Sequence, residues 1–389
     1  MTVSTVEEGV GLVGRAERIA TEVAARHADD VDRRARFPAE AIEAIRTERL
    51  LSALVPRSLG GEEATLPQVA EATFCLARAC ASTAMVFAMH QLQVACLVRH
   101  GTTPALRDYL RDVVEHQLLI ASATTERGVG GDTGASVCAV ETSGGRFALE
   151  KLAPVISYGE QADAILLTAR RTPDSAPHDQ VMVLCTPPGL RLEPTNGWEA
   201  MGFRGTCSSG FRVVAEGDET AVLPQPFDVI AGETNVPVAH VLWAHVWLGI
   251  AAEATWRARA YVQAEARKHP GGVPAPARGL AQLDALYLQM AALVRAAAER
   301  HERLDADGQL TAAVGYTTEM NALKVTASTM VVRIVGEALG VCGMAGYRED
   351  SPYRMGRLLR DAHGAPLMIN NDRLLDNNAR LLLVDRRAP

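Results

Sequence analysis

The stretch that decides the fold is residues 119–165, LIASATTERGVGGDTGASVCAVETSGGRFALEKLAPVISYGEQADAI. It begins with small hydroxyl residues, passes through a glycine-rich loop, and then makes two β-like runs about a turn at Gly144-Gly145. The residues on both sides of it repeat with the period of a helix, whereas its own runs repeat with a period near two. The sequence therefore predicts a β domain between two helical domains.

The N-terminal third is expected to be helical throughout. Residues 10–34 and 38–50 place apolar side chains at helical spacing, and a short amphipathic helix is expected over 104–115. A long run over 66–99 is so rich in Ala, Leu and Val that a single helix buried nearly all round is expected. We therefore assign residues 1–117 to an N-terminal all-helical domain.

Short β-rich runs continue to about residue 224. ILLTARR, QVMVLCT, LRLEP and SGFRVVAE are separated by Pro, Gly and Asp, and this spacing is typical of an antiparallel barrel or sandwich of roughly eight strands. We assign 118–224 to this middle β domain. Long helical patterns then return over 236–267, 277–305 and 309–341, and their short links predict an antiparallel bundle over 225–389.

The predicted fold class is thus α+β with several domains. It consists of an N-terminal helical domain, a middle antiparallel β-barrel and a C-terminal four-helix bundle. The net charge of −7, with no stripe of Lys and Arg, argues against nucleic-acid and anionic-membrane partners. No basic segment followed by an apolar run opens the sequence, so neither a signal peptide nor a membrane span is expected, and the cytoplasm is the expected location.

The cysteines and acidic residues do not suggest a metal site. Seven cysteines are scattered and mostly lie in apolar runs, which is typical of buried free thiols. Neither CxxC nor HExxH is present, and no acidic triad has metal-ligand spacing. We therefore expect no protein-bound metal.

Five segments spread over the chain resemble the acyl-CoA dehydrogenase superfamily. Residues 122–132, SATTERGVGGD, resemble the family's TEPxxGSD loop, in which the Thr hydroxyl and nearby backbone N–H groups bond the flavin pyrimidine. The resemblance assigns Thr124, Thr125, Gly130 and Gly131 to the cofactor, with Thr125 as the expected hydroxyl donor. Fixed donors suit this place, because a reduced flavin accumulates negative charge near N1 and C2=O.

Two further segments of the β domain carry the resemblance. Val155-Ile156-Ser157 stands in the place of the family's W-I-(S/T), whose hydroxyl meets flavin N5. This implies that Ser157 contacts N5 and that Val155 replaces the Trp that usually shields the dimethylbenzene side. Residues 201–208, MGFRGTCS, resemble the family's GxR stretch, in which Arg204 is expected to fix the loop rather than to act in catalysis.

The last two segments lie in the C-terminal third. Residues 261–271, YVQAEARKHPG, resemble YxxxRxxFG, which implies that Arg267 reaches the pyrophosphate of FAD bound mainly by a neighbouring subunit. Residues 337–347, EALGVCGMAGY, and the following RDA triplet resemble EAxQxxGGxGY and RDA. The resemblance assigns Gly343 and Asn371 to the cofactor as well. Departures from the family pattern at the adenine side include the missing Phe and Gln.

The usual catalytic base is missing from both places where the family holds it. A family dehydrogenase needs a carboxylate within hydrogen-bond reach of the substrate α-carbon. Counting from the RDA triplet places it at Ile369, and counting along the first bundle helix places it at Ala239. His363 and Asp372 are the substitute candidates, although Asn371 or Asp372 is equally well explained as a helix N-cap.

Other titratable residues near these segments have a simpler explanation. His240 and His245 lie at helical spacing beside Trp243 and Trp247, where packing is the expected role. Glu160 follows the predicted N5 contact but is expected at the surface. His90 occurs in both enzymatic branches of the family and does not decide between them.

Three functions remain open. The favoured one is flavin-dependent α,β-dehydrogenation of an acyl thioester, on CoA or a carrier protein, with FAD bound and a base other than the usual glutamate. The alternative is a two-component monooxygenase of the same fold, which takes reduced FMN or FAD from a separate reductase and uses oxygen. The third is a non-catalytic partner subunit of a heteromeric dehydrogenase. For the flavin enzyme the resemblance implies a homodimer or homotetramer.

Overall fold

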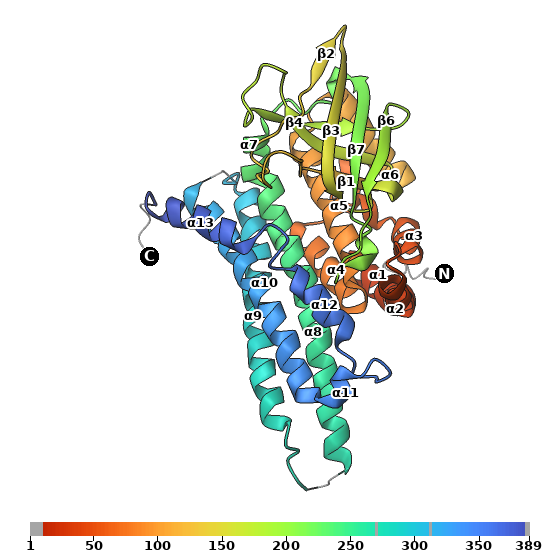
Figure 1. The fold of residues 1–389 in the computed structure, drawn as a ribbon, viewed down its shortest axis with the longest axis vertical. Helices are drawn as coiled ribbons and strands as arrows, with labels where there is room; N and C mark the ends of the chain where they lie inside the picture. The colour runs from red at the N-terminus through yellow and green to blue at the C-terminus, as the bar shows by residue number, and fades with distance from the viewer. Residues whose placement is uncertain (1–10, 269–270, 311–312, 386–389) are drawn as a thin grey trace, which may run out of the picture.

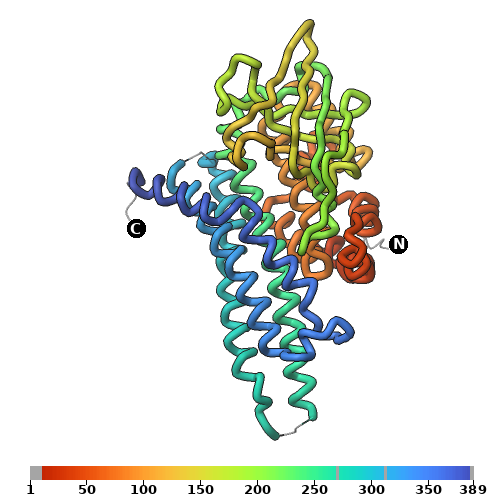
Figure 2. Tube along the Cα trace, in the orientation of Figure 1, coloured from red at the N-terminus to blue at the C-terminus, as the bar shows by residue number. Residues whose placement is uncertain are grey.

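The computed structural model describes residues 11–268, 271–310 and 313–385. The strands gather at one end, and the long helices α8 (Val236–Lys268), α9 (Ala277–Ala306) and α10 (Val314–Cys342) extend away from them (Figure 1). Helices α1 and α13 lie on opposite sides of the molecule, and the C-terminal segment runs back along the bundle toward the strands (Figure 2). The N-terminal α-helices are α1 (Leu12–Ile19), α2 (Ala25–Arg34), α3 (Ala39–Thr47), α4 (Leu66–Ala79), α5 (Ala81–His100) and α6 (Pro104–His116).

The apolar run over 66–99 forms two helices rather than the single helix predicted. Thr65 and Gln68 make a capping box that begins α4, and the extended backbone of Cys80 (φ −146°, ψ 106°) separates α4 from α5. The carbonyl of Ala79 accepts a hydrogen bond from Arg357 (3.1 Å), which satisfies a group that the helix end leaves free. The prediction missed the break because no Gly or Pro marks it.

Three helical segments, within α5, α7–α8 and α10, are long and apolar enough to cross a membrane by length and composition. In the fold, 83% of the apolar window is buried inside the protein for α5 and for the α7–α8 segment, and 39% for α10. The near-complete burial expected for the apolar run is therefore found in α5, whose apolar side chains pack in the protein core.

The β region contains two open sheets instead of a closed barrel. A three-stranded sheet has the order β1-β4-β5, and a four-stranded sheet has the order β2-β3-β7-β6. The pair β1–β4 is parallel, whereas the other pairs are antiparallel. Seven strands lie in the described part of the chain: β1 (Ile120–Ala123), β2 (Glu141–Ser143), β3 (Arg146–Ile156), β4 (Ala164–Arg170), β5 (Gln180–Cys185), β6 (Leu190–Asn196) and β7 (Ser209–Asp218).

Strand β3 shows why this part of the sequence folds as predicted. Its side chains alternate between exposed and buried from Arg146 to Ala153, as period-two patterning requires. The pairing with β7 shifts register between Ala153 and Ile156, around Pro154, which has no N–H to donate to the ladder. This irregularity redirects the chain immediately before Ser157.

The C-terminal region holds three long helices rather than four. They pack on one another, α4 packs against α8, and α13 packs against α10. The fourth long helix was overcounted, because α12 and α13 are short. The C-terminal helices are α7 (Phe227–Ile230), the π-helical η7 (Ala231–Asn235), α8 (Val236–Lys268), α9 (Ala277–Ala306), α10 (Val314–Cys342), α11 (Met344–Tyr347), α12 (Gly356–Gly364) and α13 (Asn371–Leu382).

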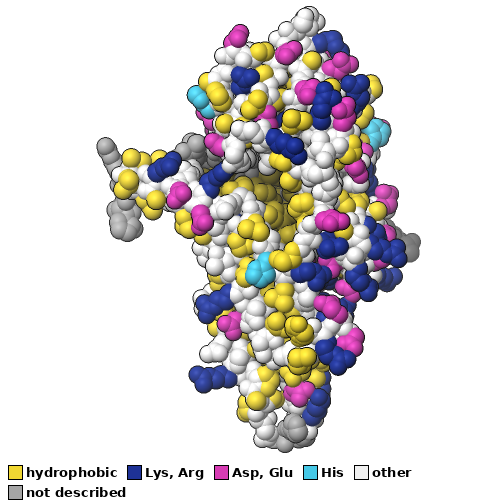
Figure 3. All heavy atoms as spheres, viewed as in Figure 1, with side chains coloured by type: hydrophobic (Ala, Val, Ile, Leu, Met, Phe, Trp, Pro, Cys, Tyr) yellow, Lys and Arg dark blue, Asp and Glu magenta, His cyan; other side chains and the backbone are white. Residues whose placement is uncertain are grey.

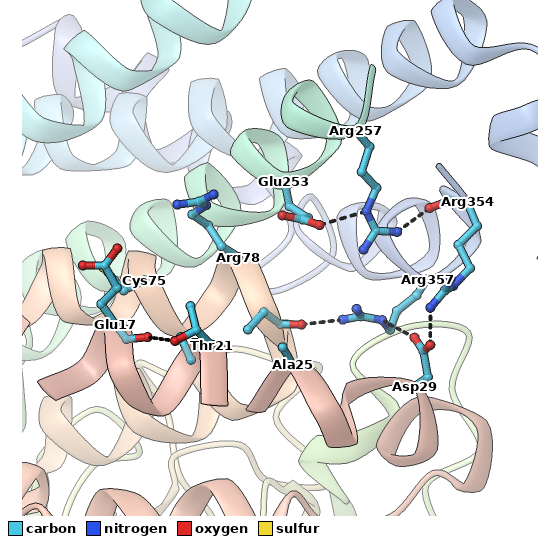
Figure 4. A pocket seen from close by; sticks show the side chains of 12 residues that line it. Glu17, Thr21, Ala25, Asp29, Cys75, Arg78, Glu253, Arg257, Arg354 and Arg357 are labelled. Carbon is cyan, nitrogen blue, oxygen red and sulfur yellow. Dashed lines mark hydrogen bonds and ion pairs between the residues drawn. The ribbon is translucent and has the colours of Figure 1, made fainter. Parts of the chain in front are cut away.

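A small polar pocket of about 220 Å³ lies where the N-terminal helices meet α8 and the start of α12 (Figure 4). Asp29 of α2 accepts a hydrogen bond from Arg354 and lies 3.5 Å from the guanidinium of Arg357. Burial opposes ionisation of Asp29, but these two arginines outweigh it and lower its pKa. On the opposite wall Glu253 pairs with Arg257 at 2.9 Å. The two pairs of Asp29 join α2 to the start of α12, whereas the pair of Glu253 with Arg257 lies within α8.

Candidate active site

A cavity of about 760 Å³ opens between the sheets, α5, α8 and the loop from α12 to α13. Ligand sites commonly have this size and a mostly apolar lining. In the same orientation as Figure 1, a hollow lined with hydrophobic side chains is visible where the strands meet the long helices (Figure 3). Four of the predicted cofactor residues line the cavity: Thr124, Thr125, Val155 and Ser157.

Hydroxyl groups form one wall of the cavity. Ser157 Oγ lies 2.8 Å from Ser208 Oγ, and Ser208 Oγ lies 2.7 Å from Thr206 Oγ1. The hydroxyl of Thr206 donates its hydrogen bond to the carbonyl of Phe203 at 2.8 Å, because a carbonyl can only accept. The protons must therefore run from Ser157 to Ser208 to Thr206. Ser157 is left with free lone pairs, which can accept a hydrogen bond from a ligand.

The glycine-rich loop is held in place from beneath by a buried carboxylate. Glu126 accepts hydrogen bonds from the hydroxyl of Ser136 and the backbone N–H of Cys138, both at 2.6 Å, and lies 3.4 Å from the ammonium of Lys151. Lys151 also donates to the carbonyl of Thr168 at 2.6 Å. Strands β3 and β4 belong to different sheets, so this lysine ties both sheets to the loop that carries Thr124 and Thr125.

Gly130 and Gly131 do not line the cavity. Both have positive φ (60° and 77°), the conformation that glycine adopts most readily. Their carbonyl oxygens accept hydrogen bonds from the guanidinium of Arg373 on α13. The structure therefore assigns these two glycines to a contact with the last helix, and the neighbouring Thr133 and Gly134 line the cavity instead.

Both positions expected to hold a base line the cavity, and neither carries a carboxylate. Ile369 and Ala239 are part of its wall. Among the described lining residues the only carboxylate is that of Asp228, an exposed residue at the start of α7. His363 also lines the cavity and is exposed. Asp372 is exposed and lies outside the lining.

The start of α13 differs in detail from the prediction. The N-cap is Asn370, whose side chain accepts a hydrogen bond from the backbone N–H of Asp372 at 2.7 Å, so neither Asn371 nor Asp372 is the cap. The side chain of Asn371 instead accepts a hydrogen bond from the buried Lys324 at 2.8 Å, and Lys324 also donates to the carbonyl of Ile369 at 2.5 Å. Burial lowers the pKa of Lys324 to about 8. This lysine holds the loop that forms one side of the cavity.

Two family models match the chain: the acyl-CoA dehydrogenase N-terminal domain over residues 7–117 and the C-terminal domain over residues 233–368. The chain belongs to the acyl-CoA dehydrogenase superfamily. It is a flavin oxidoreductase, and FAD is the cofactor of this family. The helix–sheet–helix order predicted from the sequence is therefore confirmed as the acyl-CoA dehydrogenase fold.

Individual relatives within the superfamily carry out different reactions. The amino sugar nitrososynthase DnmZ of Streptomyces peucetius is 27% identical over 87% of this chain and 84% of its own length. A dibenzothiophene monooxygenase of Rhodococcus erythropolis is 27% identical over 59% of this chain and 58% of its own length. The crystal structure of FMN-bound TdsC from Paenibacillus sp. A11-2 shares the fold, with a TM-score of 0.84 at 19% identity, covering 97% of this chain and 98% of that one.

The cavity fits the flavin ring of an acyl-CoA dehydrogenase fold. Hydroxyl groups stand on the β side, and apolar side chains of α5 and α8 face them. The side-chain oxygen of Gln180, which also lines the cavity, is buried without a hydrogen-bond partner in the described structure. The lining thus offers polar partners for the ring edge and apolar surface for its faces. The residues that would hold the ring are Thr124 and Ser157. The hydroxyl of Thr125, the donor that the resemblance implies, instead donates to the carbonyl of Val155 at 3.1 Å and is not free to donate to the flavin.

Besides Gly130 and Gly131, three residues assigned to the cofactor by the family resemblance do not line the cavity: Arg267, Gly343, and Asn371, whose side chain is bound by Lys324. Arg267 is exposed near the end of α8, at the far end of the bundle from the strands. Gly343 precedes α11 with φ 54° and does not line the cavity either. One copy of the chain does not bring Arg267 and Gly343 together with the hydroxyl wall.

The histidines of the helical core are structural. Burial lowers the pKa of His240 and of His245 to about 4, so both are neutral near pH 7, and neither lines the cavity. His90 Nδ1 accepts a hydrogen bond from the backbone N–H of Ile120 at 3.0 Å, and its Nε2 therefore carries the proton and donates to the carbonyl of Leu51 at 2.8 Å. Glu160 is exposed, as predicted.

Sequence reasoning missed several lining residues. Ser208 and Thr206 were noted only as part of a loop, although they complete the hydroxyl wall. Gln93 and Trp243 on α5 and α8 were not considered for ligand binding. The signal for Ser208 was weak, because it comes beside Ser157 only through the pairing of Ile156 with Ser209 between β3 and β7.

Proposed function

We propose that the protein is a two-component flavin-dependent monooxygenase, which takes reduced FMN or FAD from a separate reductase and uses oxygen. The observation that carries the proposal is the cavity wall. Ile369 and Ala239 stand where a dehydrogenase of this superfamily holds its base, and both are apolar. Abstraction of an α-proton requires a base in reach, whereas oxygenation does not. The names of two relatives, a nitrososynthase and a monooxygenase, are consistent with this choice.

The direction of the hydrogen bonds in the hydroxyl wall also supports binding of a reduced flavin. A bound reduced flavin would supply the electrons that activate oxygen. Ser157 donates its proton to Ser208 and offers lone pairs toward the cavity. An N–H donor at flavin N5 is present in the reduced ring and absent from the oxidised ring, so Ser157 suits the reduced form. The apolar residues of α5 and α8 keep water away from the same space.

We further propose that the protein acts in the cytoplasm as a homodimer or homotetramer. Arg267 and Gly343 lie away from the cavity of their own chain. If they bind the cofactor, as the family resemblance implies, they bind that of a second copy.

The function is tested by the behaviour of the flavin during turnover. We expect oxidised flavin to separate from the protein on gel filtration, and oxygen-dependent turnover to require an added flavin reductase. Butyryl-CoA and palmitoyl-CoA, added anaerobically, are expected to leave protein-bound FAD yellow. Bleaching of FAD by either thioester would establish the dehydrogenase instead. A tightly held flavin that responds to neither thioester nor oxygen would support the partner-subunit alternative.

Two substitutions test the hydroxyl wall. Ser157→Ala is expected to weaken flavin binding and to shift the flavin absorption spectrum, because the contact to N5 is lost. Ser208→Ala frees the proton of Ser157, so we expect oxidised FMN to bind about fivefold more tightly relative to reduced FMN, the size of one net hydrogen bond. Fluorescence titration and the reduction potential of bound FMN measure both effects. Ser209→Ala, next in sequence but outside the lining, is the control; an unchanged ratio in Ser208→Ala would contradict the proposed proton order.

A further inference from the structure

Helix α5 forms one side of the cavity, and we call the part that follows this helix from Met85 to Gln93 the α5 arm. Met85, Met89, Leu92 and Gln93 line it from one face of the helix. The hydroxyl wall lies near the Met85 end, because the loop that contains Thr206 packs its Gly205 against Ser82, where a Cβ would come within 3.0 Å of Ser82 Cβ. From Met85 to Gln93 an α-helix rises about 12 Å. The arm is therefore long enough for a molecule of two or three fused rings.

The far end of the arm is closed by the start of the bundle. Asn235 of η7 donates a hydrogen bond to the sulfur of Cys96 on α5 at 3.7 Å, which joins the two elements just beyond Gln93. Most side chains around this end are apolar or aromatic, and besides Gln93 the polar ones among them are Asp228 and Asn235. The apolar and aromatic residues are Leu92, Phe227, Ala231, Val236, Ala239 and Trp243. Methionine and aromatic side chains adapt to flat apolar ligands.

The lining offers no free cation to an anionic substrate. Arg360 is the only Arg or Lys of the described lining, and it pairs with Asp32. The phosphates of a CoA ester, or a substrate carboxylate, therefore find no counter-charge in the wall. This absence disfavours an anionic molecule, and the one lining carboxylate, Asp228, is exposed to solvent rather than buried in the wall, so the buried part of the lining suits a neutral molecule.

Two buried polar atoms at the far end have no hydrogen-bond partner in the described structure, the acceptor Gln93 Oε1 and the donor Trp243 Nε1. Gln93 Nε2 donates to the carbonyl of Met89 at 3.3 Å, and because a carbonyl only accepts, the amide orientation is fixed. Gln93 Oε1 is then a buried acceptor with no hydrogen-bond partner in the described structure. An unpaired buried acceptor is unfavourable, and a ligand that donates a hydrogen bond to Gln93 Oε1 removes this cost.

We propose that the α5 arm is the substrate site and that it binds a neutral, fused-ring aromatic molecule whose N–H or O–H group donates to Gln93. This inference rests on the proposed function only in taking the hydroxyl wall as the flavin side. The ring system lies between the methionines of α5 and Trp243 of α8, with its donor at the far end. Because the donor group of the substrate lies at the Gln93 end, far from the hydroxyl wall, the opposite edge of the substrate points toward the flavin.

The test compares indole with benzothiophene, which has nearly the same shape and lacks the N–H donor. Binding of both to the FMN-loaded protein is measured by isothermal titration calorimetry, for the wild type and for Gln93→Met, which keeps the volume and removes the acceptor. We expect the preference for indole over benzothiophene to fall by roughly five- to tenfold in Gln93→Met, the value of one hydrogen bond. Comparing the indole-to-benzothiophene affinity ratio of the variant with that of the wild type cancels the difference in hydrophobicity between the two probes.

Gln91→Met is the matched control, because Gln91 lies on the same helix and also has an unpaired buried oxygen but does not line the cavity. Its ratio is expected to stay within about twofold of the wild type. An unchanged ratio in Gln93→Met, a larger change in Gln91→Met, or binding of neither probe would overturn the proposal. Should Gln93→Met fail to fold, 1-methylindole replaces it as the test, and equal binding of indole and 1-methylindole to the wild type would overturn the proposal.

These outcomes are separate from those of the proposed function. A Gln93-dependent preference for indole in a protein that bleaches with an acyl thioester would retain the site and reject the monooxygenase. Reductase- and oxygen-dependent turnover without that preference would retain the monooxygenase and reject the site.

Discussion

Replacing Lys151 with methionine is expected to lower the free energy of unfolding by about 3–5 kcal/mol. The side chain of Lys151 is 0% exposed and that of its partner Glu126 is 4% exposed. Removal of the ammonium leaves a buried carboxylate without its counter-charge and the Thr168 carbonyl without its donor. Both sheets and the glycine-rich loop lose a shared contact, so flavin binding is expected to weaken with stability. Urea denaturation and flavin titration measure the two effects.

Two further variants separate the buried charge from the loss of a lysine. Adding Glu126→Gln to Lys151→Met is expected to recover part of the lost stability, because the uncompensated charge is gone while an oxygen still accepts from the Cys138 N–H. Lys268→Met breaks only an exposed pair with Glu265 and is expected to change stability by less than about 0.5 kcal/mol. Equal effects of Lys151→Met and Lys268→Met would show that the buried pair does not hold the loop.

Gly202→Ala is expected to destabilise the protein by about 2–3 kcal/mol and to weaken flavin binding at least roughly tenfold. A Cβ at this position would lie 2.1 Å from the carbonyl oxygen of Arg360 and 2.8 Å from the N–H nitrogen of Asp361. These neighbours are backbone atoms, so no side chain can turn aside. The loop must move away from α12, and both line the same cavity.

The move would also stretch a hydrogen bond at the centre of this contact. The backbone N–H of Phe203 donates to Asp361 at 2.7 Å, and burial raises the pKa of Asp361 to about 6. Gly197→Ala is the control, because a Cβ there meets nothing within 4 Å. Thermal unfolding measures the stability of the two variants, and FMN titration measures their flavin affinity. Wild-type flavin affinity in Gly202→Ala would mean that the loop and α12 need not touch for the site to form.

The parts of the fold that local pattern determines could be predicted from the sequence. The change of period from 3.6 to 2 and back located the β region, and the alternation along β3 follows it residue by residue. The parallel pairing of β1 with β4 was not predicted, because it joins Ile120 to Ala164 across an intervening hairpin. Nothing in the local sequence distinguishes a closed barrel from two open sheets.

The candidate site was predictable to the same extent. Short motifs brought Thr125, Val155 and Ser157 to one cavity, since each lies in a segment with a strong local pattern. The clamp of Lys324 on the carbonyl of Ile369 was missed, because it joins residues on different helices and loops 45 positions apart. Long-range side-chain contacts of this kind decide which residues face the cavity.

The two apolar wall positions also bear on how this scaffold could exchange one chemistry for another in evolution. Ala239 lies within α8, and a glutamate suits a helical backbone. Ile369 has a left-handed backbone (φ 50°), and its carbonyl is held by the Lys324 ammonium, which would lower the pKa of a carboxyl introduced beside it. An acid acquired at 369 would therefore be a poor proton acceptor, whereas one acquired at 239 would avoid that clamp. The shortest mutational path to abstraction of a substrate α-proton is therefore a substitution at Ala239 on α8.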